Sequence, residues 1–260
     1  MRAGRPGAPR PGSRPVDSNR VFVWSPGKPP ERIAEGVWLV RGGFPAKLMN
    51  VYLIEDGGGV TVFDAGISAM TGAVAAAGAD LGGIRRVVLG HADADHRGAA
   101  PGLGAAVLCH EADRAAAESA SPFRSYWDFG RLRLPVNLVM PRLLRHWDGG
   151  AVRIAGVVAE GDEVAGFRVL HLPGHAPGLI GLFRESDRLA LCSDCIYTFD
   201  VETGIPGPPR VPHPAFNLDT DQARASIRRL AGHDPAAVWA GHTGPLRGDV
   251  RAQLERVAAA

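Results

Sequence analysis

The sequence lacks any long run of apolar residues. Residues 1–19, MRAGRPGAPRPGSRPVDSN, hold arginines and turn-forming residues but no apolar run of about 7 to 15 residues, which a secretory signal requires. No later segment approaches the roughly 20 apolar residues of a membrane-spanning helix. The sequence therefore predicts a protein without a secretory signal and without a membrane partner.

Cysteine is also scarce. The three cysteines, Cys109, Cys192 and Cys195, are an odd number, and their spacing does not suggest a disulfide framework in a chain of 260 residues. Cys192 and Cys195 form a CxxC pair, but without a second pair we interpret them as small buried core residues. A reducing compartment fits this content best, and we expect a cytoplasmic protein.

Lysine is nearly absent. Only Lys28 and Lys47 are lysines among 29 basic residues, which stand against 27 acidic residues and give a net charge of +2. Residues 1–20 hold five arginines and one aspartate, so the remaining body is slightly acidic. Because a nucleic-acid-binding surface normally shows a basic face or stripe, we expect no nucleic-acid partner.

The part of the chain that can build a core lies behind a polar lead-in. Residues 1–30 are rich in Pro, Gly and Arg and poor in aliphatic residues, so we expect a flexible segment there. With 45% hydrophobic residues overall, the remaining length is enough for a substantial core. The sequence therefore predicts one α/β domain over residues 31–260.

Strand and helix patterns run through this domain. Short apolar runs bounded by turn signals predict strands, and Ala-rich or amphipathic segments predict helices. The expected strands are 36–41, 49–55, 60–64, 85–89, 105–110, 152–158, 163–172, 179–184, 189–192 and 237–240. The expected helices are 68–81, 111–120, 220–232 and 247–259, the third with an N-cap at Asp219 or Thr220.

One segment, GHADADHRG, places four metal-binding side chains within six residues, directly after the apolar run at 85–89. They are His91, Asp93, Asp95 and His96. Side chains at positions i and i+2 of an extended backbone point the same way. A turn at 95–96 then directs the next two side chains toward a neighbouring point, so that one loop can serve two metal ions.

This loop resembles the signature of the metallo-β-lactamase superfamily, HxHxDH, which is followed by three distant ligands at the ends of later strands. His175 in LPGHAPG, Asp194 in LCSDC and His242 in AGH resemble those later positions. The resemblance spans about residues 33–245. It implies an α/β fold of four layers, an αββα sandwich of two mixed sheets flanked by helices, with the metals at one edge.

The resemblance also implies two divalent metal ions and assigns their ligands. One ion is held by His91, Asp93 and His175, the other by Asp95, His96 and His242, and both are bridged by Asp194. Asp93 departs from the commonest signature, which has a second histidine there, and gives the variant HxDxDH. We expect zinc first. Because a carboxylate is a harder ligand than imidazole, manganese and iron are the alternatives.

The function implied by the resemblance is that of a binuclear hydrolase. Two metals about 3.5 to 4 Å apart can bridge a hydroxide that acts as nucleophile, and Asp95 can collect the proton for the leaving group. Tyr197, in SDCIYT, resembles a tyrosine of the acyl-homoserine-lactone lactonases that hydrogen-bonds the substrate carbonyl; an ordinary packed aromatic is the other interpretation. We expect cleavage of an ester, thioester or lactone bond, with Asp95 and Tyr197 as catalytic residues.

Residues 121–150 form an insert that bears on the substrate. Prolines at 122, 135 and 141 predict short, broken helices. Its large side chains suit an acyl or aromatic small-molecule substrate, and equally a lid or a homodimer contact: Phe123, Tyr126, Trp127, Phe129, Leu138 and Met140. The main alternative function is an iron-dependent oxidoreductase of the same superfamily, acting on oxygen or persulfides, which the carboxylate of Asp93 favours.

Overall fold

The structure, a computed structural model, describes residues 30–44 and 47–260. The expected flexible segment at residues 1–30 lies outside the described residues except for Pro30. The first strand begins at Glu31, where the sequence predicts the folded domain to start.

The first half of the chain builds a seven-stranded sheet whose strands lie side by side in chain order. The first four pair antiparallel, and the last four are parallel, with helices in the crossovers. The strands are β1 (Glu31–Ala34), β2 (Val37–Gly42), β3 (Met49–Asp56), β4 (Gly59–Phe63), β5 (Ile84–Val88), β6 (Ala106–Cys109) and β7 (Ile154–Val157).

The second half builds a five-stranded sheet in the order β14-β11-β10-β9-β8. Its strands β9, β11 and β14 run in the same direction, so their carboxyl ends lie at one edge. The bounds are β8 (Glu163–Val164), β9 (Phe167–His171), β10 (Ile180–Arg184), β11 (Leu189–Leu191) and β14 (Ala237–Trp239), and a separate hairpin joins β12 (Tyr197–Phe199) to β13 (Pro206–Arg210).

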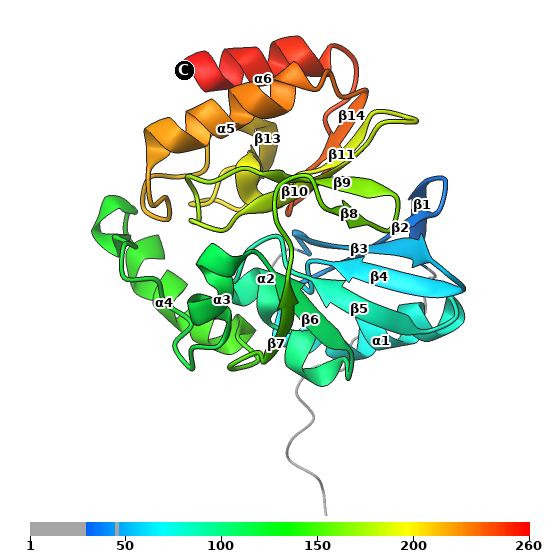
Figure 1. Cartoon of the computed structure of the whole chain (residues 1–260). Helices are drawn as coiled ribbons and strands as arrows, with labels where there is room; N and C mark the ends of the chain where they lie inside the picture. The colour runs from blue at the N-terminus through cyan, green and yellow to red at the C-terminus, as the bar shows by residue number, and fades with distance from the viewer. Residues whose placement is uncertain (1–29, 45–46) are drawn as a thin grey trace, which may run out of the picture.

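The two sheets pack face to face, and helices cover their outer faces (Figure 1). Strand β3 shows how the sequence does this: Val51 and Leu53 face the helix layer, whereas Tyr52 and Ile54 face the other sheet, because successive side chains of a strand alternate. Helix α1 (Thr71–Asp80) covers the first sheet, and α5 (Thr220–Gly232) and α6 (Val250–Ala259) cover the second. The predicted αββα sandwich is confirmed.

Two of the predicted elements are wrong in detail. The strand expected at 163–172 is the hairpin β8–β9, because Ala165 and Gly166 take positive φ values of 49° and 79° and reverse the chain. The insert is less broken than expected, since α4 (Val136–Trp147) continues through Pro141. Met140, Leu144 and Trp147 lie at helical spacing on one face of α4, and this face is buried. Its packing stabilises the helix despite the proline.

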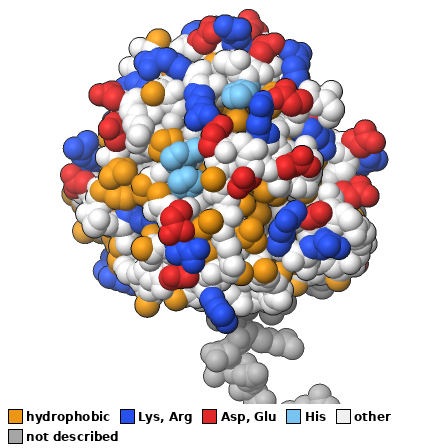
Figure 2. Space-filling view, in the orientation of Figure 1, with side chains coloured by type: hydrophobic (Ala, Val, Ile, Leu, Met, Phe, Trp, Pro, Cys, Tyr) orange, Lys and Arg blue, Asp and Glu red, His pale blue; other side chains and the backbone are white. Residues whose placement is uncertain are grey.

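The shorter helices complete the chain between these elements. They are α2 (Ala94–Arg97), α3 (Glu111–Ala117) and the single 3-10 turns η1 (Ser68–Met70), η2 (Ala100–Gly102), η3 (Phe129–Arg131) and η4 (Ser193–Cys195). Among the described residues, no helix has the length and apolar character needed to cross a membrane. Figure 2 shows acidic and basic side chains interspersed over one face of the molecule.

Candidate metal centre

Four strand ends bring the candidate ligands to one edge of the sandwich. His91 follows β5, and the short helix α2 behind it carries Asp95 and His96. In the second sheet, His175 lies in the loop after β9, Asp194 in η4 after β11, and His242 after β14. Because β9, β11 and β14 are parallel, their following loops meet at the same edge, and all seven residues singled out in the sequence come together there.

The first group of ligand atoms surrounds Asp93. Its Oδ2 lies 3.3 Å from Nε2 of His91 and 3.3 Å from Nε2 of His175. Nε2 of His175 in turn lies 3.8 Å from Oδ2 of Asp194. In a tetrahedral zinc site with donors at about 2.0 to 2.1 Å, neighbouring donors are about 3.4 Å apart. The spacing of these atoms fits a divalent ion in their midst.

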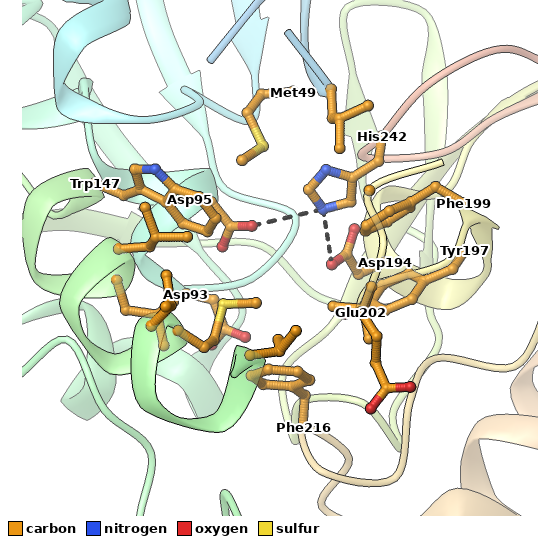
Figure 3. A pocket seen from close by; sticks show the side chains of 18 of the residues that line it. Met49, Asp93, Asp95, Trp147, Asp194, Tyr197, Phe199, Glu202, Phe216 and His242 are labelled. Carbon is orange, nitrogen blue, oxygen red and sulfur yellow. Dashed lines mark hydrogen bonds and ion pairs between the residues drawn. The ribbon is translucent and has the colours of Figure 1, made fainter. Parts of the chain in front are cut away.

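The second group consists of Asp95, His96 and His242, and Figure 3 shows Asp95 and His242 close to Asp194. Nε2 of His242 is 3.3 Å from Oδ2 of Asp194 and 3.6 Å from Oδ2 of Asp95, and Nε2 of His96 is 3.4 Å from Oδ1 of Asp194. Oδ2 of Asp194 thus lies near a histidine of each group, since it is 3.8 Å from Nε2 of His175 and 3.3 Å from Nε2 of His242. A carboxylate in this position can bridge two ions.

Several of these buried atoms have no hydrogen-bond partner. Nε2 of His91, His96 and His175 and Oδ1 of Asp194 are all in this state. A buried polar atom without a partner is destabilising by about 1–3 kcal/mol, so four around one point require an explanation. Gly241 keeps the space open, because a Cβ there would overlap Oδ1 of Asp194 and Cε1 of His96. The chain's own donors therefore fit metal ions.

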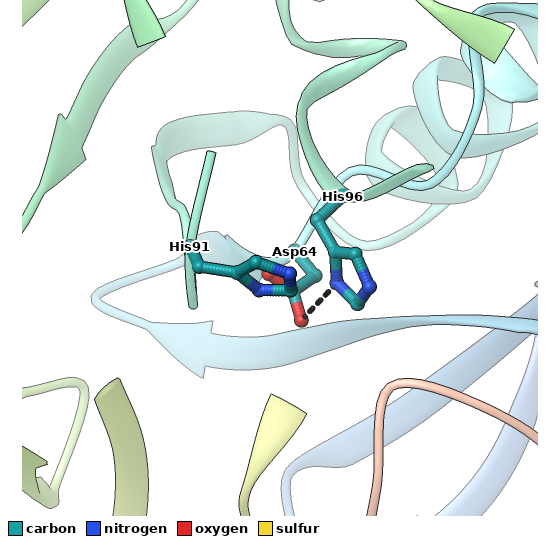
Figure 4. Close-up of side chains that lie close together, drawn as sticks. All are labelled: Asp64, His91 and His96. Atoms are coloured by element: carbon teal, nitrogen blue, oxygen red, sulfur yellow. Dashed lines mark ion pairs between the residues drawn. The ribbon is translucent and has the colours of Figure 1, made fainter. Parts of the chain in front are cut away.

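Asp64 and Ser193 orient the rings of His91 and His96, and Figure 4 shows Asp64 beside both rings. Oδ2 of Asp64 lies 3.0 Å from Nδ1 of His96 and accepts a hydrogen bond of 2.7 Å from Ser193 Oγ, which also lies 3.2 Å from Nδ1 of His91. Asp64, His91 and His96 lie close enough together to form a third possible group of metal ligands. Because Asp64 contacts the Nδ1 side, however, it orients the rings and leaves their Nε2 atoms free to bind a metal.

The two later histidines are held in a similar way. Nδ1 of His175 donates to Oδ1 of Asn217 at 3.1 Å, which directs its Nε2 into the site. The loop of His242 is tied to the first sheet, where the Asn50 side chain donates to the carbonyls of Ala240 and Thr243 at 3.0 and 2.9 Å. Contacts across both sheets therefore fix the ligand cluster.

The electrostatics of the cluster favour cations. Burial lowers the pKa of His96, but the carboxylates of Asp194, Asp64 and Asp95 outweigh burial and raise it well above its ordinary value. Burial raises the pKa of Asp194, yet His242 and His96 hold it well below its usual range. The lowered pKa of Asp194 favours its ionised form and the raised pKa of His96 favours a protonated ring, so a metal ion that binds His96 must displace that proton.

Tyr197 lies at the edge of the cluster. Its ring centroid is 6.0 Å from that of His175 and 5.9 Å from that of His242. Burial, followed by the charges of Asp194 and Asp95, raises the pKa of its phenol well above the ordinary value. Tyr197 therefore remains a neutral hydrogen-bond donor beside the candidate metal site.

An apolar cavity of about 290 Å³ opens on the same cluster (Figure 3). It is lined by Asp93, Asp95, Asp194 and His242 of the cluster and by apolar side chains from three regions of the chain. These apolar side chains include Phe44, Leu48, Met49, Val136, Val139, Met140, Leu143, Leu144, Trp147, Phe199, Val201 and Phe216. None of the described residues that line the cavity is a lysine or an arginine.

The insert contributes to this cavity, but only partly through the residues expected from the sequence. Trp127 and Met140 line it, whereas Phe123, Tyr126, Phe129 and Leu138 do not. Phe123 and Phe129 pack edge-on against each other and against the core instead, and Leu138 is 58% exposed because it lies on the outer face of α4. The helical periodicity of α4 decides which of its side chains face the cavity, and Pro135 and Pro141 prevented its prediction from the sequence.

Sequence reasoning missed the residues that support the ligands. Asp64, in FDAG, follows an apolar strand as the ligands do, and that position was a usable signal. Ser193, Asn217, Asp113 and Arg124 carry no local signature. By contrast, the five other histidines, 110, 146, 171, 213 and 233, belong to no potential metal group among the described residues.

Comparisons with known proteins agree with this geometry. A profile described as the Metallo-beta-lactamase superfamily matches residues 48–242. The chain is 35% identical over 96 residues to the probable metallo-hydrolase YflN of Bacillus subtilis, a match that covers 33% of this chain and only 35% of that protein. The chain thus aligns with about a third of the length of this curated relative.

Two solved structures show the same fold. TTHA1429, a metallo-beta-lactamase family protein from Thermus thermophilus, superposes with a TM-score of 0.65 at 27% identity, over 88% of this chain and 80% of that chain. TTHA1623, solved in a di-iron-bound form, superposes with a TM-score of 0.59 at 24% identity, over 84% of this chain and 97% of that chain.

Proposed function

The chain belongs to the metallo-beta-lactamase superfamily, and on that basis we propose that it is a metal-dependent hydrolase of a small ester, thioester or lactone with an apolar acyl group. The observation that carries the proposal is the direct opening of the ligand cluster onto the apolar cavity. Such a cavity with a few convergent polar groups is the usual form of a small-molecule site.

In this proposal the seven clustered residues hold two divalent ions. His91, Asp93 and His175 hold the first, Asp95, His96 and His242 hold the second, and Asp194 bridges them. The distances among their donor atoms support this division. Zinc is the first expectation, and the carboxylate of Asp93 favours manganese or iron more than a histidine would.

The ions, when bound, would polarise the substrate carbonyl and lower the pKa of a water molecule toward about 7. Asp95, whose side chain is 15% exposed, faces the cavity and is placed to take up a proton and pass it to the leaving group. The neutral phenol of Tyr197 is placed to donate a hydrogen bond to the substrate carbonyl oxygen.

The lining of the cavity points to a neutral acyl group as substrate. Its walls are apolar, and its one carboxylate outside the cluster, Glu202, already accepts a hydrogen bond of 2.6 Å from the backbone of Arg133. A substrate with an anionic group away from the reacting bond would need a cation in the walls, and the described lining residues include no lysine or arginine. An aliphatic or aromatic acyl group gains instead about 25 cal/mol for each Å² of apolar surface buried there.

Two neighbouring residues of α4 allow a matched test of the cavity. Val139 lines it and is 44% exposed, whereas Leu138 is 58% exposed and lies outside it. With an ester, thioester and lactone series of increasing acyl length, Val139→Trp should raise KM for the longest acyl groups by about 10- to 200-fold, which corresponds to a loss of roughly 1–3 kcal/mol of binding free energy. Leu138→Trp should leave the series unchanged. Equal profiles for both variants would contradict a substrate site in this cavity.

A second candidate, an iron-dependent oxidoreductase, is supported by the three carboxylates among the proposed ligands, Asp93, Asp95 and Asp194. TTHA1623, of the same fold, was solved in a di-iron-bound form. The two functions separate in one assay of the iron-loaded and zinc-loaded proteins. Acid release from esters or lactones with either metal supports the hydrolase, whereas oxygen consumption with a persulfide, seen with iron alone, supports the oxidoreductase.

A further inference from the structure

Arg124, from the insert, lies against the ligand that departs from the commonest signature. Its Nε donates to Oδ1 of Asp93 at 2.6 Å, whereas Oδ2 of the same carboxylate faces Nε2 of His91 and of His175. The guanidinium side chain is 8% exposed and the carboxylate 4%. One oxygen of Asp93 is therefore occupied by arginine, and only the other is directed into the first ligand group.

A second buried carboxylate holds the arginine in place. Nη2 of Arg124 donates to Oδ2 of Asp113 at 2.8 Å. The same Asp113 accepts the backbone N–H of Ala92 at 2.8 Å and that of Gly178 at 3.1 Å. Asp113 thus joins the loop that carries His91 and Asp93 to the loop that follows His175, and Arg124 completes the connection.

Aromatic packing and a buried ion pair fix the segment that delivers Arg124. On one side Phe123 stacks edge-on with Phe129, and on the other Trp127 stacks edge-on with Phe216, with ring centroids 6.0 and 5.5 Å apart. Just before this segment, the carbonyl of Ser121 accepts a hydrogen bond from Arg97, which also forms an ion pair with Asp148 at the end of the insert. The guanidinium of Arg124 is therefore held on a preformed loop.

The charges explain why a cation is needed at this position. Replacing a neutral imidazole by Asp93 adds one negative charge to a buried cluster that already contains Asp95 and Asp194. Buried like charges are destabilising unless a cation is close by. Arg124 is the described cation in contact with Asp93, and its planar fork suits two carboxylates at once.

We propose that Arg124 is the positioning residue of the first metal site: clamped by Asp113, it fixes the carboxylate of Asp93 with Oδ2 toward the metal and compensates the charge that the carboxylate adds. The proposal rests on the metal site of the proposed function. It makes Asp93 and Arg124 one functional unit, so that neither is exchangeable without the other.

The test is the metal content and affinity of the full chain, measured by elemental analysis after dialysis and by zinc titration calorimetry. In Arg124→Gln we expect the affinity for one of two ions to fall by about 10- to 100-fold, as when an outer partner of a metal ligand is removed, and the other ion to be retained. Arg124→Lys, which keeps the charge but loses the fork, should show a smaller loss. The matched control is Arg131→Gln, since Arg131 pairs with Asp128 in the same insert but is 59% exposed.

A double variant separates positioning from mere support of the fold. The single variant Asp93→His should bind zinc more weakly, because it leaves Arg124 beside a neutral ring. The double variant, Asp93→His with Arg124→Gln, should recover a zinc affinity within a few fold of that of the unsubstituted protein. A structural role would make the double variant the worst of the three. Retention of both ions at unchanged affinity in Arg124→Gln and Arg124→Lys overturns the proposal, whereas an original chain that binds no metal overturns the proposed function itself.

Discussion

Oδ2 of Asp64 lies 3.0 Å from Nδ1 of His96, on the opposite side of the ring from the Nε2 that faces Asp194. Asp64 also accepts the backbone N–H of Gly90 through Oδ1 at 2.7 Å, and it takes a positive φ of 56° to do so. A positive φ is uncommon for a residue other than glycine, and at this position it accompanies the contacts of the carboxylate with His96, Ser193 and Gly90.

The first prediction concerns this contact. Asp64→Asn should lower zinc affinity by about 10- to 100-fold, because an amide does not stabilise the ring in the orientation that exposes Nε2. Titration calorimetry measures it. Asp187→Asn is the control, since Asp187 pairs with Arg184 at the surface and is 40% exposed. Equal affinities of the two variants would show that Asp64 does not orient His96.

The second prediction concerns Arg97, which follows His96 and is 1% exposed. Its guanidinium pairs with Asp148 at 3.0 Å and donates to the carbonyls of Ala117, Ser119 and Ser121 at 3.0 to 3.1 Å. Arg97→Met leaves Asp148 buried without its cation, so the free energy of unfolding should fall by about 3–5 kcal/mol in urea denaturation. Arg251→Met, at the exposed pair with Glu255, should leave it nearly unchanged.

The third prediction concerns Tyr197. Removing one donor to a developing oxyanion lowers kcat by about 10²- to 10³-fold, so Tyr197→Phe should show a loss of that order with its metal content intact. Tyr126→Phe serves as the control, because Tyr126 does not line the cavity. An unchanged kcat in Tyr197→Phe would assign this residue to packing alone.

The fourth prediction concerns the pH dependence of the metal-free chain. His96 and His175 have pKa values raised in the folded state, chiefly by Asp194 for the first and Asp93 for the second, against the effect of burial. Their contribution to stability is complete below about pH 6.5, the pKa of histidine in the unfolded chain, and is lost as the pH rises through the folded values. With a chelator present, the melting temperature should therefore fall from pH 6.5 to 8.5.

Bound metal should reverse this trend, because ions displace the same protons and bind more tightly as the pH rises. Thermal melts in chelator and in excess zinc at each pH give the comparison. The carboxylates act at the other end of the range: Asp93 and Asp194 have lowered pKa values, so their contribution is lost only under acid conditions. A chelated chain that gains stability between pH 6.5 and 8.5 would contradict the account.

Some parts of the fold and site are local enough to be predicted from sequence. Helix α5 spans the expected residues, and it begins at Thr220 because Asp219 caps it by accepting hydrogen bonds from the N–H groups of Asp221 and Gln222. The ligand candidates are identified because the HxDxDH loop and the three later positions, His175, Asp194 and His242, resemble the superfamily signature. The superfamily is confirmed by the match over residues 48–242.

Other parts depend on contacts between distant residues. The pairing of Arg124 with Asp93 spans 31 positions, and that of Ser193 with Asp64 spans 129. Nothing in the local sequence of an arginine within an aromatic insert indicates which carboxylate it meets. Helix α4 was also misjudged at Pro141, since the burial of Met140, Leu144 and Trp147 outweighs the intrinsic effect of proline.

The proposed function requires that the seven clustered residues hold two metal ions that drive hydrolysis. Its most direct measurement is the rate of ester and lactone hydrolysis as chelator-treated protein is titrated with zinc, with bound metal determined at each step. The account predicts activity that rises to a plateau at two ions per chain and that His96→Ala does not reach. Full activity without metal, or none in a chain that holds two ions with any of zinc, manganese and iron, would contradict it.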